Sequence, residues 1–331
     1  MAEFPPELQG EKLTPTHHPG LDLIRATEAA ALAAGRWMGL ADREGADHAA
    51  QDAMFAAINL LPMRGHIVCG EEGRVGIHSP LDSGCTVGTG DGPELDVELN
   101  AIDGASLVAQ GLPGAVAVAA LAPKGSMWHP GPSIYIHKLV VDRTVAAALT
   151  PETLDAPPAW ILALVARQKG KDIRDLTVFI VDRPRHAGLI AEVRKAGARV
   201  FLRTGGDVGG SLLAADPSAP IDVLMGIGGA AEGLISACAV KALGGAMLAR
   251  IAPQSEEEKT ACADAGLTDR TILTCEHMVK GNEVYFAATG VTDGVLLDGV
   301  GYHGDTVETH SLALRMETGT RRIINTEHTI R

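Results

Sequence analysis

The chain of 331 residues is long enough to bury two cores, and 46% hydrophobic with 21% charged residues is typical of a folded globular protein. Its net charge of −13 argues against a nucleic-acid partner, because phosphate backbones require a basic surface. The five cysteines lack metal-ligand or disulfide spacing, and there is neither a signal peptide nor an apolar run of membrane length, so we expect a cytoplasmic protein without membrane contact.

The first part of the chain predicts helices followed by strands. Residues 1–20 are proline-rich and without periodicity, which indicates a loosely held arm. Thr27 has the chemistry of an N-cap for an alanine-rich helix over 27–38. A second helix over 46–60 carries Asp47 in its first turn. Short strands are predicted at 67–69, 94–100, 115–121 and 135–141.

In the second part of the chain, strands and short helices alternate after a proline-containing junction at 151–175, where a helix is expected over 159–169. Such alternation is typical of a layered α/β domain. The predicted strands are 177–181, 199–202, 221–224, 284–288 and 311–315, and the predicted helices are 188–196, 209–215, 231–243 and 254–266. We therefore expect an arm (1–20), an N-terminal α+β domain (21–150) and a C-terminal α/β domain (151–331).

The segment 94–105 predicts a strand with one oxygen-bearing face and a tight turn after it. Side chains alternate across a strand, so Asp96, Glu98 and Asn100 share one face while the core takes the other. Asp103 follows just before the turn. Hard oxygen donors gathered in this way are the ligands that Mg²⁺ or Mn²⁺ prefers.

Four acidic residues share one context, at the end of a strand or the start of a helix: Asp47, Glu71, Asp103 and Glu232. Backbone amides are free at such places, which therefore tolerate carboxylates and can host metals and phosphates. Each acid alone is better explained as a cap or a solvated residue, so the interpretation depends on their joint occurrence. Before Glu232, glycines in 226–229 predict a turn that admits this carboxylate to a metal. Their spacing does not match a dinucleotide-binding loop.

Two arginines predict a phosphate site. Arg183 and Arg185 follow a predicted strand, where their guanidinium groups can hold a phosphate through bidentate hydrogen bonds. A solvated basic loop is the competing interpretation. Nearby in the expected sheet, Tyr135 and His137 share one face of their strand and Lys138 lies on the other. A lone tyrosine or histidine on a strand is more often structural than functional.

Eight segments share their residue pattern with a known family: 27–33, 46–47, 67–71, 87–90, 184–186, 206–208, 226–233 and 288–294. Through them the chain, from about residue 27 to residue 322, resembles the class II fructose-1,6-bisphosphatases, some of which also act on sedoheptulose-1,7-bisphosphate. The resemblance implies a layered α/β/α/β/α fold of the sugar-phosphatase and inositol-phosphatase type. It also implies dependence on Mg²⁺ or Mn²⁺ and a homo-oligomer, either dimer or tetramer.

The resemblance also implies roles for individual residues. It places the metal ligands at Asp47, Glu71, Asp103 and Glu232, with Asn100 able to add its carbonyl oxygen. The expected catalytic set is Asp47, Glu71, Glu72 and Asp103. The sugar phosphate is expected at Tyr135, Arg183, Arg185, Gly206 and Asp207. On this basis the domain 21–150 binds metal and the domain 151–331 binds the sugar phosphate.

The departures from the family pattern fall in the motifs that would bind metal and activate water. Asn100 and Ala105 stand where the family has an acid and a threonine, and Gly205 stands where an acid is usual. The family's second acid after residue 70 is lost or displaced by one position. Glu72 and Glu98 are its candidate replacements, and Glu98 shares a strand face with Asn100. Losing one base or orienting group typically costs ~10²–10⁴-fold in rate.

Three functions are compatible with these residues. The first is metal-dependent hydrolysis of a sugar (bis)phosphate such as fructose 1,6-bisphosphate. The second is non-hydrolytic chemistry on a phosphorylated sugar by a repurposed paralogue (an isomerase, epimerase or lyase), with His137, where the family usually has an acid, as proton carrier. The third is a catalytically silent ligand-binding protein, which the retained carboxylates disfavour because idle buried carboxylates are costly. We expect the first.

Overall fold

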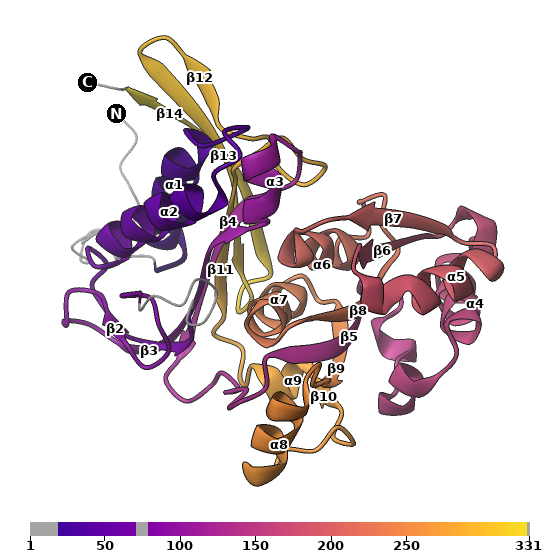
Figure 1. The fold of residues 1–331 in the computed structure, drawn as a ribbon. Coiled ribbons are helices and arrows are strands. Elements are labelled where there is room, and N and C mark those ends of the chain that lie inside the picture. Colours follow the sequence, from indigo (N-terminus) through magenta and orange to yellow (C-terminus); the bar gives the residue numbers. More distant parts are fainter. Residues whose placement is uncertain (1–18, 71–78, 330–331) are drawn as a thin grey trace, which may run out of the picture.

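Two β-sheets alternate with three layers of helices in the computed structural model, which describes residues 19–70 and 79–329. From one side of the molecule to the other, the helix layers are α1 (Pro19–Gly35) with α2 (Arg43–Ile58), then α6 (Asp207–Ala215) with α7 (Ala230–Ala242), and finally α4 (Pro158–Lys169) with α5 (Ala187–Lys195) (Figure 1). The predicted layered α/β/α/β/α fold is therefore confirmed. No helix of the described residues is both long and apolar enough to cross a membrane.

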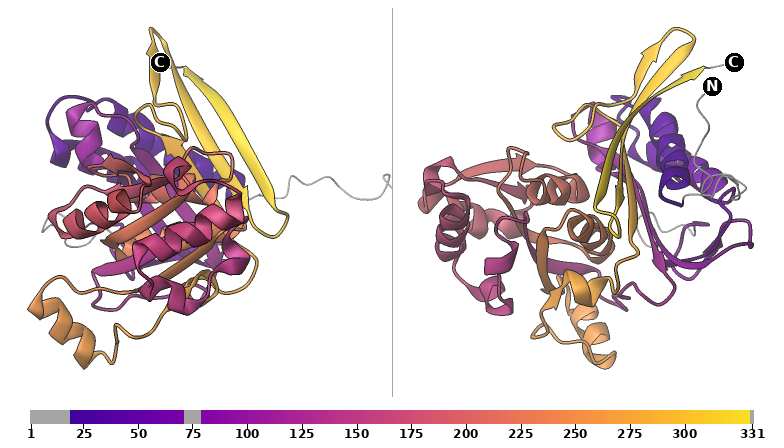
Figure 2. Two further views of the ribbon diagram at one scale, coloured as in Figure 1. Left: turned by 90° about the vertical axis from the view of Figure 1, so that its right-hand side faces the viewer. Right: turned by 180° about the vertical axis from the view of Figure 1, so that it is seen from behind.

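The first sheet lies between the α1–α2 layer and the α6–α7 layer, and its strand order is β12-β13-β11-β4-β3-β1-β2, with β14 paired to β13. Its strands are β1 (Arg64–Cys69), β2 (Thr86–Val87), β3 (Glu94–Asp103), β4 (Val116–Pro123), β11 (Tyr285–Gly290), β12 (Gly301–His303), β13 (Thr306–Arg315) and β14 (Thr320–Thr329). Among these described strands, β1 and β3 are parallel and the other pairs are antiparallel. Figure 2 shows the β13–β14 hairpin reaching beyond the rest of the sheet.

The second sheet has the strand order β10-β9-β5-β8-β6-β7. Its strands are β5 (Tyr135–Val141), β6 (Thr177–Val181), β7 (Arg199–Arg203), β8 (Val223–Gly229), β9 (Ala246–Ile251) and β10 (Leu273–Thr274). Strands β6, β7 and β8 are parallel, so their carboxyl ends share one edge. The antiparallel β5 starts at that same edge, because Tyr135 pairs with Gly229. Ligand sites in α/β folds form at such edges.

The remaining helices are short. They are α3 (Ala105–Gln110), α8 (Glu256–Asp264) and α9 (Cys275–Met278), together with the 3₁₀ turns η2 (Ala146–Ala148), η3 (Pro151–Asp155), η4 (Ile173–Asp175) and η5 (Pro184–His186). Two of them matter for the site. Helix α3 begins two residues after the end of β3, and η5 begins three residues after the end of β6, so both start near strand ends where candidate residues lie.

The described residues form three hydrophobic cores, and the middle one fills the interfaces on both sides of the α6–α7 layer. The middle core joins α6 and α7 to both sheets and includes Ile136 and Val140 of β5. The core under α4 and α5 takes the alternate residues of the same strand, Leu139 and Val141. Strand β5 therefore has an inner face toward α6 and α7 and an outer face toward α4 and α5. Lys138 lies on the inner face and His137 on the outer face, as the alternation predicts.

Two separate stretches of the chain form the first sheet, and the stretch between them forms the second sheet. The chain leaves the first sheet after β4, enters the second at β5 and returns to the first at β11. The return depends on pairing between distant segments, for example Ala120 with Phe286. Short-range patterns do not record such non-local pairing, which decides sheet membership.

The prediction that Thr27 caps a helix is wrong. Helix α1 begins at Pro19, and Thr27 is fully buried inside it. Its hydroxyl donates to the carbonyl of Ile24 (2.9 Å) and shares a hydrogen bond with the hydroxyl of Thr289 (2.8 Å). Threonine supplies the same hydroxyl inside a helix as at its start, so cap chemistry alone was misleading here.

Helix α2 also begins earlier than predicted. The side chain of Asp42 accepts a hydrogen bond from the amide of Gly45 (2.8 Å) and caps the helix. Asp47 consequently lies in the second turn of α2 rather than the first, and it is buried. The free backbone amides at the start of α2 therefore lie one turn before Asp47, because the helix begins at Arg43.

The glycine-rich segment before α7 is a strand and not the predicted turn. Gly226, Gly228 and Gly229 all lie within β8, which runs to the first residue of α7. The sequence analysis also did not predict strands β2, β9, β10, β12 and β14. Glycine usually indicates a turn, but inside a strand it indicates close approach of another group. The groups that approach β8 are described with the site.

Candidate active site

Asp103, at the end of β3, connects the first sheet to the start of α6. Its Oδ1 atom accepts a hydrogen bond from the amide of Asp207 (3.1 Å), and its Oδ2 atom accepts one from the amide of Gly209 (2.9 Å). The first amides of a helix have no partner within the helix, so a carboxylate satisfies them and interacts favourably with the helix dipole. This contact joins the end of β3 in the first sheet to the helix that follows β7 of the second sheet.

The surroundings of Asp103 disfavour its charged form. Burial raises the pKa of Asp103 to about 7, against the hydrogen bond from Gly209, and the negative charges of Asp207 and Glu232 raise it further. The positive charge of Lys138 acts in the opposite direction. Asp207 and Glu232 therefore both lie within electrostatic reach of Asp103, and a cation beside Asp103 would be stabilised.

Asp207 is held by a buried lysine, for which the sequence predicted a strand face but no role. The Nζ atom of Lys138 donates to Oδ2 of Asp207 (2.7 Å), and the Lys138 side chain is only 1% exposed. A buried ammonium is tolerated when it is paired and hydrogen-bonded. The alternation along β5 predicted which way Lys138 faces, but no sequence signal identified Asp207 as its partner.

The glycines of β8 make room for two of these carboxylates. A Cβ atom at Gly228 would collide with Oδ2 of Asp207, and one at Gly229 would collide with Oε2 of Glu232. Glu232 lies in the first turn of α7, directly after the strand. Side chains at both positions would displace the carboxylates, so the missing Cβ atoms are part of the site.

Tyr135 and Arg185 meet at the same edge of the second sheet. The Arg185 guanidinium lies 5.0 Å from the centre of the Tyr135 ring and donates from Nε (3.2 Å) and Nη2 (2.8 Å) to the carbonyl of Ile227. Arg183 instead donates to the carbonyl of Asp182 in its own loop (2.9 Å). The structure thus brings Arg185, but not Arg183, against Tyr135.

Asn100 supplies a buried oxygen near the end of β3. The residue is 3% exposed, and within residues 19–70 and 79–329 its Oδ1 atom has no hydrogen-bond partner. A buried acceptor without a donor costs about 1–3 kcal/mol. Such an oxygen is suited to binding a cation. Of the residues on this strand, Asn100 therefore best fits the role of a metal ligand.

The carboxylates alone do not complete a metal centre in the described part of the chain. There, no group of three or more His, Cys, Asp or Glu side chains is placed to hold a metal ion. Asp47, Asp103 and Glu232 therefore do not form such a group among themselves. Glu71 and Glu72 lie outside the described residues. The donors that are present are all oxygens, which is the chemistry that Mg²⁺ and Mn²⁺ prefer.

The two other acids of β3 are hydrogen-bonded to neighbouring backbone. Oδ2 of Asp96 accepts from the amide of Met127 (2.9 Å), and Oε2 of Glu98 accepts from the amide of Cys69 (3.0 Å). Both side chains are buried. Glu98 therefore has a structural role at the irregular β1–β3 pairing, and this role competes with the one considered for it as a replacement acid.

A hydroxyl lies close to Ala105 and Gly205, two of the positions that depart from the expected pattern. Ala105 is the first residue of α3, and Ser106 follows it. A Cβ atom at Gly205 would lie 3.3 Å from Oγ of Ser106, so this hydroxyl faces the position where the sequence resemblance predicts an acid. The sequence analysis missed Ser106, because nothing in its local pattern distinguishes it from an ordinary helix-start serine.

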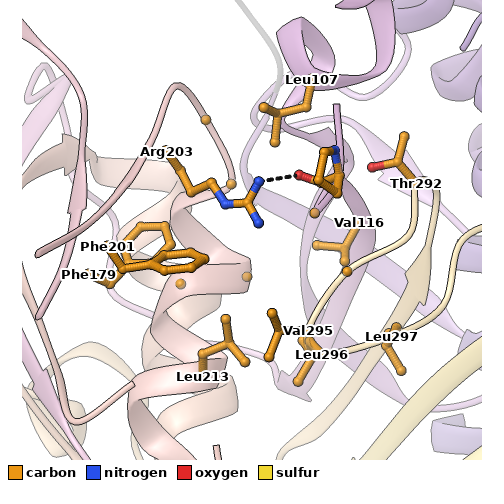
Figure 3. Close-up of a pocket in the computed structure, with 17 residues that line it drawn as sticks. Leu107, Val116, Phe179, Phe201, Arg203, Leu213, Thr292, Val295, Leu296 and Leu297 are labelled. Carbon is orange, nitrogen blue, oxygen red and sulfur yellow. Dashed lines mark hydrogen bonds between the residues drawn. The ribbon is translucent and has the colours of Figure 1, made fainter. Parts of the chain in front are cut away.

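An apolar hollow adjoins the site on the side of Gly205 and Gly206 (Figure 3). Phe179 and Phe201 line it from the second sheet. Arg203 lies across it, with the guanidinium 4.9 Å from the centre of the Phe201 ring and Nη1 donating to the carbonyl of Pro113 (3.1 Å). Arg203 thereby ties the end of β7 to the loop before β4.

His137 lies away from the carboxylates. It is on the outer face of β5, whereas Lys138 and Asp207 are on the inner side. Burial, with the positive charge of Arg250, lowers the pKa of His137 to about 4. The geometry therefore gives no support to His137 as a proton carrier beside Asp103.

The chain is similar to proteins of known class along nearly its whole length. A family model described as bacterial fructose-1,6-bisphosphatase, glpX-encoded, matches residues 17–328. A D-fructose 1,6-bisphosphatase class 2/sedoheptulose 1,7-bisphosphatase of Synechococcus sp. (strain JA-3-3Ab) is 37% identical over 333 residues, covering 93% of this chain and 95% of that protein. A fructose-1,6-bisphosphatase 2 class 2 of Escherichia coli (strain K12) is 38% identical over 320 residues, covering 92% and 98%.

Proposed function

Because this chain belongs to the family of bacterial class 2 fructose-1,6-bisphosphatases, we propose that it hydrolyses a phosphate ester of a sugar bisphosphate such as fructose 1,6-bisphosphate. The observation that carries the proposal is the contact of Asp103 with the first amides of α6, which sets Asp103, Asp207 and Glu232 at one edge. That edge also holds Tyr135 and Arg185, which suit a phosphate group.

The proposed metal is Mg²⁺ or Mn²⁺, bound by the oxygens of Asn100, Asp103 and Glu232. Asp47 and Glu71 are further proposed ligands, and Glu72 a proposed catalytic acid, from the resemblance alone. A divalent ion at this position supplies positive charge to the transferring phosphoryl group. The oxygen-only donor set supports the proposal, and so does the buried Oδ1 atom of Asn100, which has no hydrogen-bond partner among the described residues.

The chain's own residues bind and orient the substrate in this proposal. Arg185, fixed by the carbonyl of Ile227 and the Tyr135 ring, binds the phosphate that is not cleaved. Asp207, fixed by Lys138, accepts hydrogen bonds from sugar hydroxyls beside Gly206. Arg183 joins the phosphate site only by turning away from its own loop. Asn100 and Ala105 lower the turnover that this arrangement reaches.

The test is phosphate release from a panel of sugar mono- and bisphosphates, including fructose 1,6-bisphosphate and sedoheptulose 1,7-bisphosphate, with Mg²⁺ or Mn²⁺ added. We expect release from a bisphosphate that stops on chelation and falls sharply in Glu232→Gln. Tight binding of these sugars without release from any of them would overturn hydrolysis and favour a binding protein. Conversion of a sugar phosphate without loss of phosphate would favour non-hydrolytic chemistry.

A homo-oligomer, dimer or tetramer, is the assembly we propose. Strand β14 pairs with β13 on one side, and in the described chain no strand pairs with its other side. Ten residues of open strand edge, including the exposed Ile323, can be covered by a second copy. Light scattering after size exclusion tests this proposal. A monomer at micromolar concentration would contradict it.

A further inference from the structure

A hollow of about 670 Å³ opens on the outer face of the second sheet, on the other side of β5 from Lys138. Residues of β5, β8 and β9 form its floor, and η3, η5, α5 and the segments 252–254 and 269–270 form its walls. Its volume lies in the range of small-molecule sites. Of the proposed substrate residues Arg185 lines it, whereas Tyr135 and Asp207 do not, so the hollow adjoins the candidate active site.

Basic side chains outnumber acidic ones in this hollow. Arg185, Arg250 and Arg270 line it together with Asp155 and Asp269. Nη1 of Arg250 is 2.6 Å from Oδ1 of Asp155, whereas Arg270 is exposed and forms no ion pair with the described residues. The surplus of positive charge is local, since the whole chain carries a net charge of −13.

The imidazole of His137, which has no hydrogen-bond partner among the described residues, also lines the hollow. His137 pairs directly with Arg250 across β5 and β9, is largely buried, and makes no hydrogen bond with the described residues. The second histidine, His186, is already committed. Its Nδ1 contacts the carbonyl of Val181 (2.6 Å), and its Nε2 accepts from the amide of Ile227 (2.8 Å). His137 is thus the neutral ring with a donor still to offer.

We propose that this hollow is a second anion site, which binds a phosphate group, free or as the ester of a small metabolite, through Arg250, Arg270 and His137. Guanidinium groups hold phosphate oxygens through paired, charge-assisted hydrogen bonds. A neutral imidazole adds a donor without needing a proton from solvent. Arg185 borders this hollow and also belongs to the proposed substrate set, so the two sites share a wall.

The probe is radiolabelled inorganic phosphate in equilibrium dialysis with the full chain, at constant ionic strength and with a chelator present. We expect saturable binding that weakens about tenfold or more in Arg250→Gln and in Arg270→Gln. Arg270 is a surface residue, so its variant should fold normally. The matched control is Arg174→Gln, an exposed arginine paired with Asp172 and outside the hollow, which should bind like the unaltered chain.

His137 provides a second, independent pair of variants. His137→Gln keeps a neutral donor and should retain phosphate binding. His137→Asp places an acid beside Arg250 and should abolish it, and thermal unfolding confirms that the variant is folded. Displacement of the label by glucose 6-phosphate would assign the site to phosphate esters, and displacement by unlabelled phosphate alone would assign it to free phosphate.

Two results would overturn the proposal. One is phosphate binding unchanged in both arginine variants. The other is loss of binding in Asp103→Asn, which would place the bound phosphate in the active site instead. Because the measurement requires neither metal nor turnover, its outcome is independent of whether the protein is a bisphosphatase.

Discussion

The two faces of β5 carry titratable side chains at adjacent residues, His137 and Lys138, and surround them differently. On the inner face, Lys138 is 1% exposed and its ammonium has a fixed partner in Asp207, which itself lies against Gly228. On the outer face, His137 and Arg250 border an open hollow, and only Arg250 has a partner, Asp155. On the inner face the Lys138 ammonium is paired with the Asp207 carboxylate. On the outer face the hydrogen-bond donors of His137 and Arg250 border an open hollow.

This difference indicates what each face can do. A buried charge with one short, satisfied hydrogen bond keeps its neighbour in a fixed position, which suits the orientation of a substrate. Hydrogen-bond donors that line a hollow and have no partner within the protein are suited to reversible ligand binding. Substitutions that remove the matching on the inner face should therefore have larger effects than those on the outer face.

The largest effect is expected from Lys138→Met. The substitution leaves the carboxylate of Asp207 unpaired in a mostly buried place, and breaking a buried pair by removing one partner costs about 3–5 kcal/mol. Urea unfolding measures this loss in free energy of unfolding, and kcat/KM for the bisphosphate should fall with it. In the double variant with Asp207→Asn, part of the stability should return while activity stays low. A single variant as stable as the unaltered chain would contradict the comparison.

Gly228→Ala tests the close approach of Asp207 to β8. The added Cβ atom collides with the carboxylate, so Asp207 must move away from Lys138. A displacement of this kind, about 1 Å, can cost ~10²-fold in kcat/KM. Gly188→Ala is the matched control, since a Cβ atom there meets nothing within 4 Å. The control should keep full activity and gain about 0.4–1 kcal/mol of stability. Equal activity of the two variants would show that Gly228 has no positioning role.

On the outer face, His137 should make stability depend on pH. Its pKa falls from 6.5 to about 4 in the fold because of burial and Arg250, with Asp155 opposing and His186 adding. Of the other groups lining the hollow, Arg185, Arg270 and Asp269 are charged. A depressed histidine pKa favours the neutral ring, so the fold loses stability as pH falls from 6.5 toward 4.

The free energy of unfolding, followed from pH 7.5 to pH 5, measures this effect. The unaltered chain should lose about 2 kcal/mol more than His137→Gln over that range. Comparing the two proteins cancels the contribution of the other titrating groups. Parallel curves for both would mean that His137 is as well solvated in the fold as in the unfolded chain.

Sequence patterns located individual elements better than their partners. The predicted strands 135–141 and 177–181 agree with β5 and β6 in their bounds, because apolar runs bounded by turn residues are local signals. Sheet membership was not predictable, because β4 pairs with β11 more than 160 residues away. The glycines of β8 were misread for a related reason: what they accommodate is the side chains of Asp207 and Glu232, which lie elsewhere in the sequence.

The site shows the same division between local and distant information. The carboxylate context identified Asp103 and Glu232, and the structure brings them within electrostatic reach of each other. It did not identify Lys138, whose function depends on a partner 69 residues away, or Ser106, whose hydroxyl faces Gly205 only after folding. The roles proposed for Asp47, Glu71 and Glu72 stay predictions.

The smallest effect is expected from restoring the residues that the family pattern favours at the end of β3. Asn100→Asp combined with Ala105→Thr adds a carboxylate to the inner side of the first sheet and a hydroxyl at the start of α3. We expect turnover with Mn²⁺ to rise about tenfold, which is less than the ~10²–10⁴-fold that a positioned acid or base contributes. Without metal, the extra charge near Asp103 should lower stability, because that region already disfavours negative charge. Measuring each single variant, Asn100→Asp and Ala105→Thr, separates the effect of the carboxylate on turnover from that of the hydroxyl. A double variant that binds metal more tightly yet turns over no faster would locate the limit in substrate positioning by Asp207 and Arg185, which is the side of the site that β5 controls.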